Sequence, residues 1–161
     1  MIETSAPDDV ISHSVRFADV PTLAGRHFQG SWFSVAPDRA RAFDFAAYVD
    51  DNPVEMDGDR YPDGLVEGFH LIALLDHLLN PLVNVSGDPW FGWNYGLDRV
   101  RFVSPIHAGE PIRLTGTVTA VEPRGEGFLL TFDCTVEVQC RAKPGFVAEW
   151  RVLWVPEVGN E

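Results

Sequence analysis

Carboxylates crowd the stretch DDNPVEMDGDRYPDGLVEGFH, which covers residues 50–70 and ends where a strongly apolar segment begins. Within this stretch Asp50 and Glu55 flank a turn at Asn52-Pro53. When two carboxylates share a dry pocket, the pKa of one rises, because both groups cannot easily carry charge there. Such a pair can serve as base and acid in proton transfer to and from a substrate.

The second chemical feature is the start of the apolar segment, Glu67-Gly68-Phe69-His70. A helix that begins here has free backbone N–H groups in its first turn, and a glycine lets a ligand approach them closely. These N–H groups can stabilise negative charge on a carbonyl oxygen. We therefore expect proton transfer next to a thioester carbonyl, with the acids of residues 50–57 beside the helix start. Glu67 fits either this site or the role of a first-turn acid favoured by the helix dipole.

The same residues resemble a known motif. In the MaoC-like hydratases and dehydratases, the group of the (R)-specific enoyl-CoA hydratases, D-x-N-P-x-H-x-D is followed by a turn and G-[TI]-[IV]-A-H-G-[FM]. The corresponding stretches here are Asp50-x-Asn52-Pro53-x-Glu55-x-Asp57 and Gly64-Leu65-Val66-Glu67-Gly68-Phe69. Glutamate thus stands at both histidine positions of the motif. The resemblance covers roughly residues 25–155.

The resemblance implies an α+β hot-dog fold, in which a curled antiparallel sheet wraps around a long buried helix, usually as a homodimer. It implies reversible addition or removal of water across the Cα–Cβ bond of an acyl thioester, carried by CoA or by a carrier protein. Asp50 and Glu55 are the implied catalytic residues. Asp51 competes with Asp50 for the motif position, because one residue fewer than usual separates Phe45 from Asn52.

The other predicted site residues bind substrate: Asn52, Glu67, Gly68, Phe69, His70, Trp93 and Tyr95. His70 either replaces the missing imidazole or is a core histidine bonded to backbone. Trp93 and Tyr95 either line an acyl cavity or pack in the core ahead of a strand. Two other activities stay open beside hydration and dehydration. One is thioester hydrolysis or another proton transfer on a related substrate, and the other is a non-catalytic acyl-binding or partner subunit.

The elements that position these residues follow from periodicity and turn residues. Residues 27–35 indicate a strand, and a helix is expected from Pro37 to about Val49. Residues 65–79 form a helix that is apolar on nearly every side, so we expect it to be buried. The second half has the period of strands at 99–103, 112–121, 128–140 and 146–155, with turns at 108–109, 124–125 and 144–145. Consecutive strands should form an antiparallel meander, and dimerisation would cover the sheet edges.

The composition supports one globular domain. With 161 residues and 45% hydrophobic side chains, the chain can bury a single core. We expect a flexible tail over 1–14 and one hot-dog domain over 15–161. The net charge of −12 argues against a nucleic-acid partner and against an anionic membrane surface. The first residues lack signal-peptide features and the longest apolar stretch is too short to span a bilayer, so a cytoplasmic location is expected.

Neither a cofactor nor a metal is expected. The sequence contains no Gly-rich phosphate loop, and Glu67-x-x-His70 provides too few metal ligands. Cys134 and Cys140 fall on the apolar side of one predicted strand, too far apart to form a disulfide with each other. We expect both to be small core residues in a reducing compartment.

Overall fold

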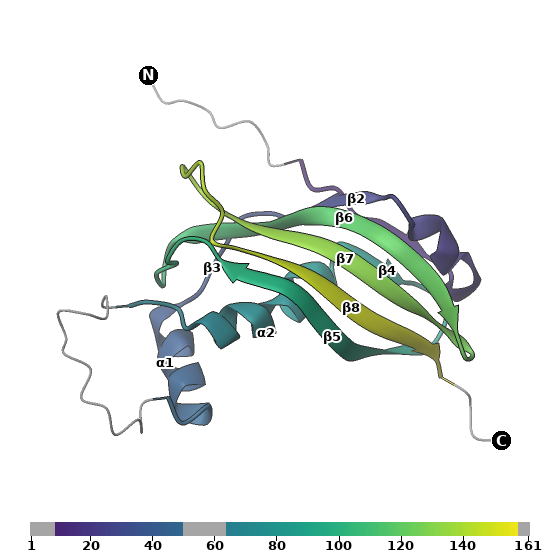
Figure 1. Cartoon of the computed structure of the whole chain (residues 1–161), viewed down its shortest axis with the longest axis horizontal. Coiled ribbons are helices and arrows are strands. Elements are labelled where there is room, and N and C mark those ends of the chain that lie inside the picture. The colour runs from purple at the N-terminus through teal and green to yellow at the C-terminus, as the bar shows by residue number, and fades with distance from the viewer. Residues whose placement is uncertain (1–8, 50–63, 158–161) are drawn as a thin grey trace.

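The computed structural model describes residues 9–49 and 64–157, and within them the main sheet has six antiparallel strands (Figure 1). The strand order is β2-β6-β7-β8-β5, and β3 pairs with the start of β6. These strands are β2 (His27–Gln29), β3 (Phe33–Ser34), β5 (Trp90–Phe102), β6 (Pro111–Arg124), β7 (Gly127–Val138) and β8 (Phe146–Pro156). A separate parallel pair joins β1 (His13–Val15) to β4 (Val83–Val85). The helices are the 3-10 helix η1 (Phe17–Leu23), α1 (Pro37–Ala46) and α2 (Gly68–Leu79).

Helix α2 lies along one face of the curved sheet, and α1 stands at the end where α2 begins (Figure 1). This α+β arrangement of a helix against a curled antiparallel sheet is the one predicted. The core forms between α2 and the sheet. Phe132 is fully buried there, and its ring centroid lies 6.1 Å from that of Phe28, 6.0 Å from that of Trp150 and 6.4 Å from that of Trp154.

Strand β7 confirms the clearest sequence pattern. Its even positions are buried from Leu130 to Val138, whereas Asp133 between them is exposed. The turn into β7 is also confirmed, since Arg124 pairs with Gly127 and Gly125 adopts a φ of 58° that glycine takes without strain. The prediction for Cys140 was wrong. This residue is exposed in the turn after β7, because the chain leaves the sheet there on its way to β8.

Strand β5 is much longer than predicted. The expected strand at 99–103 is only its last part, and Trp93 and Tyr95 lie within β5 rather than ahead of a strand. β5 also pairs with β8 and not with β6, so the consecutive meander holds only for β6, β7 and β8. Most of β5 is exposed on both faces. An edge strand with aromatic residues on both faces shows no alternation, which is why its periodicity did not indicate a strand.

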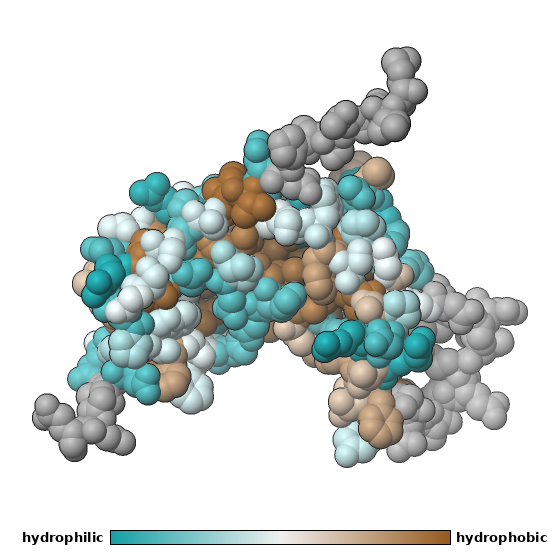
Figure 2. Space-filling view, turned by 180° about the vertical axis from the view of Figure 1, so that it is seen from behind, coloured by the Kyte–Doolittle hydropathy of each residue, from teal (hydrophilic) through white to brown (hydrophobic). Residues whose placement is uncertain are grey.

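Among the described residues, helix α2 buries one side against the sheet and leaves the other side exposed. Its buried residues are His70, Leu71, Leu75, Leu78 and Leu79. Phe69 and Asp76 are exposed, because the sheet covers a single side of the helix. Seen from behind, apolar residues show through the middle of the molecule between hydrophilic ones (Figure 2). The helix also begins at Gly68, later than expected, since Leu65 forms a β-bridge with His107 and the N-cap Glu67 has an extended backbone.

Two smaller predictions need correction. The expected strand at 27–35 is split into β2 and β3, and α1 ends at Ala46 rather than near Val49. Within the described part of the tail expected over residues 1–14, Ile11 bridges Gln29 and His13 belongs to β1, which pairs with β4. No helix within residues 9–49 and 64–157 is long and apolar enough to cross a membrane.

Candidate active site

The predicted site residues fall into three groups. Asp50, Asn52 and Glu55, together with the competing Asp51, lie outside the described residues. The group from Glu67 to His70 forms the start of α2. Trp93 and Tyr95 lie on the edge strand β5. The structure therefore brings together the helix-start group, and it places the two aromatic residues on the neighbouring strand.

The segment that leads into α2 is held by the loop at residues 105–110. Gly64 accepts a hydrogen bond of 2.8 Å from the Ala108 N–H, and the Val66 N–H donates one of 2.8 Å to the Ile106 carbonyl. The loop is itself tied together by Glu110, whose carboxylate accepts a 2.7 Å bond from the His107 N–H and pairs with Arg141. Burial opposes ionisation of Glu110, but these partners outweigh it and lower its pKa. The start of α2 is thus fixed in place.

Glu67 is the N-cap of α2. Its side-chain Oε2 accepts a hydrogen bond of 2.7 Å from the Phe69 N–H, and its carbonyl accepts one of 3.1 Å from the Leu71 N–H. A capping carboxylate also stabilises the positive end of the helix dipole. The Gly68 N–H has no hydrogen-bond partner in the part of the chain that the structure describes. The Phe69 N–H is therefore occupied by the cap, whereas the Gly68 N–H, one of the expected oxyanion donors, is left for a ligand.

Replacing Glu67 with Ala is expected to lower the free energy of unfolding by about 1 kcal/mol, because the Phe69 N–H loses its acceptor. Glu67→Asp should retain most of the stability, since aspartate is a favoured N-cap residue. Urea denaturation of the wild type and both variants measures the difference. Equal stability of Glu67→Ala and the wild type would show that the cap contributes nothing.

The side chain of His70 in α2 packs against α1. Its side chain is 9% exposed, and its ring stacks on Phe43 of α1 with centroids 4.4 Å apart and an interplanar angle of 5°. The Nδ1 atom is buried and has no hydrogen-bond partner among the described residues. Burial lowers the pKa of His70, and nearby Asp44 and Glu67 offset this only in part. The imidazole is therefore neutral near pH 7.

The stability of the protein should fall as the pH drops below about 6.5, the pKa of an unperturbed histidine. Above that pH His70 is neutral in the folded and in the unfolded chain. Below it the unfolded chain takes up the proton first, because the pKa of folded His70 is lowered, and the free energy of unfolding decreases. Urea denaturation at about pH 7 and about pH 5.5 should show a smaller loss in His70→Gln than in the wild type. The control His77→Gln changes an exposed histidine of the same helix and should keep the wild-type loss.

The remaining predicted residues lie toward β5. Gly68 packs so closely against the Phe102 ring that an added Cβ would lie 2.9 Å from a ring carbon. Phe69 is 71% exposed. Tyr95 lines a cavity of about 260 Å³ between α2 and β5, and the Arg124 guanidinium lies 5.0 Å from its ring centroid. Trp93 is 61% exposed and lines neither this cavity nor its neighbour.

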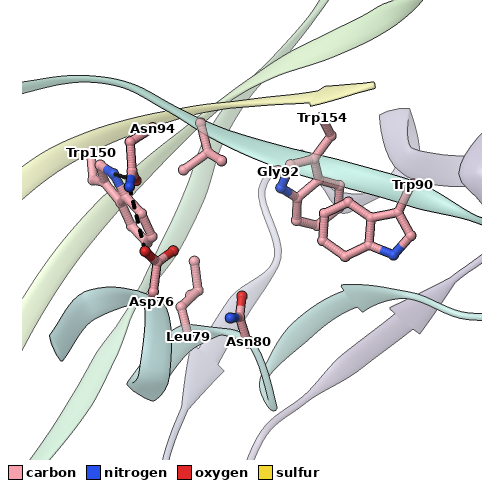
Figure 3. A pocket seen from close by; sticks show the side chains of 9 residues that line it. Asp76, Leu79, Asn80, Trp90, Gly92, Asn94, Trp150 and Trp154 are labelled. Atoms are coloured by element: carbon pink, nitrogen blue, oxygen red, sulfur yellow. Dashed lines mark hydrogen bonds between the residues drawn. The ribbon is translucent and has the colours of Figure 1, made fainter. Parts of the chain in front are cut away.

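Sequence reasoning missed a polar cluster under β5 (Figure 3). Asn94 of β5 donates a 3.4 Å hydrogen bond to Asp76 of α2 and accepts one of 3.1 Å from the Trp150 indole N–H. A cavity of about 150 Å³ lies beside this cluster, with Asn80 and Trp90 also in its wall. The sequence signal for this cluster was Asp76, the one carboxylate within the largely apolar helix α2. No group of three or more His, Cys, Asp or Glu side chains is arranged to hold a metal ion within the described chain.

The chain is similar to several known proteins, although no family model matches it. The 3-hydroxyacyl-thioester dehydratase Z of Mycobacterium tuberculosis is 33% identical over 145 residues, covering 86% of this chain and 95% of that protein. Nodulation protein N of Rhizobium meliloti is 30% identical over 152 residues, covering 86% of this chain and 90% of that protein.

A solved structure of similar fold is that of the MaoC-like dehydratase from Rhodospirillum rubrum. It superimposes with a TM-score of 0.62 at 19% identity and covers 84% of this chain and 94% of its own. The (R)-hydratase of A. caviae superimposes with a TM-score of 0.56 at 20% identity, covering 80% of this chain and 94% of its own. The similarity to the solved structures establishes the fold of this chain, and the identity to the sequence relatives establishes its family. The chain therefore belongs to the MaoC-like family of hydratases and dehydratases, hydro-lyases with the hot-dog fold.

Proposed function

We propose that the protein adds water to, or removes water from, the Cα–Cβ bond of an acyl thioester, with Asp50 and Glu55 as its acid–base pair. The observation that carries the proposal is the 33% identity to a 3-hydroxyacyl-thioester dehydratase over 86% of the chain. The helix start gives additional support. It offers a Gly68 N–H without a partner among the described residues, and the hydrogen bonds of Gly64 and Val66 hold it in position.

The proposed mechanism uses the N-terminus of α2 as the oxyanion site. The thioester carbonyl oxygen accepts a hydrogen bond from the Gly68 N–H, and the helix dipole stabilises the negative charge that develops on that oxygen. In dehydration, the ionised carboxylate removes the Cα proton, while the protonated carboxyl donates its proton to the leaving hydroxyl. The Cα–Cβ double bond forms and water departs. Hydration follows the same steps in reverse.

Two carboxylates can divide these tasks because they interact. The first negative charge raises the pKa of the second group, so that one stays protonated when the other is ionised. His70 is proposed to assist: its buried Nδ1 has no partner within the described residues, and the neutral ring can hold a hydroxyl or a water. The full proposed set of substrate-binding residues is Asn52, Glu67, Gly68, Phe69, His70, Trp93 and Tyr95.

A panel of trans-2-enoyl thioesters of CoA and of a carrier protein tests the activity. Hydration is expected to remove the enoyl absorbance, and the comparison of the two carriers identifies the preferred one. Release of free thiol from saturated acyl-CoA, without hydration of any enoyl thioester, would instead establish a thioesterase. A protein that responds in neither assay would be a non-catalytic subunit, and the proposal would be wrong.

We also propose a homodimer formed through β5. Within the described residues β5 pairs on one side only, with β8, and it exposes a row of large apolar side chains: Phe91, Trp93, Tyr95, Leu97 and Phe102. A long apolar edge strand is a template for pairing with another strand, and a second copy gives a closed symmetric pair. Sedimentation equilibrium should give twice the chain mass of 17.9 kDa. Leu97→Lys, which places a charge on this edge, should shift the protein toward the monomer.

A further inference from the structure

Two neighbouring cavities lie between α2 and β5, and together we call them the α2–β5 groove. The cavity nearer the start of α2 has a volume of about 260 Å³ and is lined by Ile72, Ala73 and residues 94–97. The deeper one has a volume of about 150 Å³ and is lined by Leu79, Asn80 and three tryptophans. Both cavities share Asp76, Asn94 and Trp150 in their walls, so the polar cluster stands where they meet.

The groove begins close to the proposed oxyanion site. Gly68, Ile72, Asp76 and Asn80 recur at every fourth position and therefore share one face of α2. β5 runs past this face in the opposite direction: Phe102 contacts Gly68, Asn94 bonds Asp76, and Trp90 lines a cavity with Asn80. At 1.5 Å of rise per residue, Asp76 lies about 12 Å along the helix from Gly68.

This distance sets the length of an acyl chain that can reach from Gly68 to Asp76. An extended chain advances about 3.5 Å for every three bonds, so about ten bonds span 12 Å. A thioester whose carbonyl oxygen is bound at the Gly68 N–H would thus bring the atom about ten bonds away to Asp76. This step depends on the proposed function, because that function places the carbonyl at Gly68.

The groove is polar where its two cavities meet, and the side chains there accept hydrogen bonds. The oxygen of the Asn94 amide is used by Trp150 and its nitrogen points to Asp76 Oδ2, so Asn94 is oriented by its neighbours (Figure 3). Asp76 Oδ1 and the side chain of Asn80 have no hydrogen-bond partner elsewhere in the described chain. A hydrocarbon tail would displace water from these groups without replacing its hydrogen bonds, which is unfavourable. A hydroxyl or an amine would replace them.

The walls of the deeper cavity beside this polar cluster are aromatic. The rings of Trp90 and Trp154 lie with centroids 4.7 Å apart, and Trp150 completes the wall on the side of Asn94 (Figure 3). Indole faces pack against methylene groups and also attract a cation. The junction of the two cavities therefore suits an apolar stretch that carries a hydrogen-bond donor, either neutral or positively charged.

We propose that the α2–β5 groove binds the acyl group and selects thioesters whose acyl group carries a hydroxyl or an amine about ten bonds from the carbonyl carbon, over unsubstituted alkyl chains. Asp76 is the specificity-determining residue, because its carboxylate accepts the hydrogen bond from that donor. Asn94 and Trp150 act through Asp76 by holding its carboxylate in place.

Isothermal titration calorimetry with saturated thioesters tests this selectivity without turnover. The probes are decanoyl-CoA, 10-hydroxydecanoyl-CoA and 10-aminodecanoyl-CoA. The wild-type protein is expected to bind at least one of the two substituted probes about tenfold more tightly than decanoyl-CoA, the value of one charge-assisted or well-formed hydrogen bond. The two substituted probes distinguish a hydroxyl from an amine. Equal affinity for all three, or binding of none, would overturn the inference.

Variants of Asp76 test whether the preference for the substituted probes depends on its carboxylate. Asp76→Leu removes the acceptor and should abolish the preference for the substituted probes, and the isosteric Asp76→Asn should abolish the part due to charge. Glu126→Gln removes one negative charge in the exposed β6–β7 turn and should keep the wild-type preference. A preference that survives Asp76→Leu would overturn the assignment. If the preference is found but no enoyl thioester is hydrated, the inference stands and the proposed hydro-lyase function fails. If enoyl thioesters are hydrated but the preference is not found, the proposed function stands and the inference fails.

Discussion

Replacing Glu55 with Gln is expected to lower kcat/KM for hydration of an enoyl thioester by about 10²–10⁴-fold, the usual contribution of one general acid or base. Glutamine is close to glutamate in size and can still form hydrogen bonds, but it cannot exchange a proton. The loss should appear mainly in kcat, because the proton transfer occurs in the chemical step. Initial rates of enoyl absorbance loss over a range of substrate concentrations separate kcat from KM.

Asp50→Asn should cause a loss of similar size, and comparison with Asp51→Asn decides which of the two aspartates is the motif acid. The double variant Asp50→Asn, Glu55→Gln should lose little more than the stronger single variant, because residues that act as a unit are not additive. Glu126→Gln removes the same charge in an exposed turn and serves as the matched control. Full activity in the double variant would exclude both assigned roles.

Phe132→Ala is expected to have the largest effect on stability, lowering the free energy of unfolding by about 3–5 kcal/mol. The side chain is fully buried and its ring contacts those of Phe28, Trp150 and Trp154, so truncation leaves a cavity in the centre of the core. A domain of this kind has a total stability of about 5–15 kcal/mol, so the variant should unfold at a much lower urea concentration.

Phe45→Ala is the control for this substitution. Phe45 is 75% exposed on α1, and its truncation should change the free energy of unfolding by no more than about 0.5 kcal/mol. Linear extrapolation of urea unfolding curves gives both values on one scale. A loss in Phe132→Ala as small as that in Phe45→Ala would mean that this aromatic cluster does not form the centre of the core.

The helix start of the candidate site was predictable because it depends on local sequence. The motif from Asp50 to Phe69 indicated the family, and an apolar run beginning at Gly68 indicated a helix whose N–H groups could face a carbonyl. Glu67 was expected either in the site or as a first-turn acid favoured by the helix dipole; it is the N-cap at that same end of α2, and a cap involves only neighbouring residues. The position of His70 against Phe43 was not predictable, since it depends on where α1 packs.

The strands that are buried on one face could be recognised from the pattern of their residues. In β7 the alternation of apolar and polar residues records which side meets the core, and in the β6–β7 turn Gly125 provides the backbone conformation that the hairpin needs. The pairing of β5 with β8 was not predictable in this way, and neither was the cluster of Asp76, Asn94 and Trp150 beneath β5. Periodicity reports that a face is covered or exposed, whereas the identity of the covering neighbour depends on contacts between residues far apart in the chain.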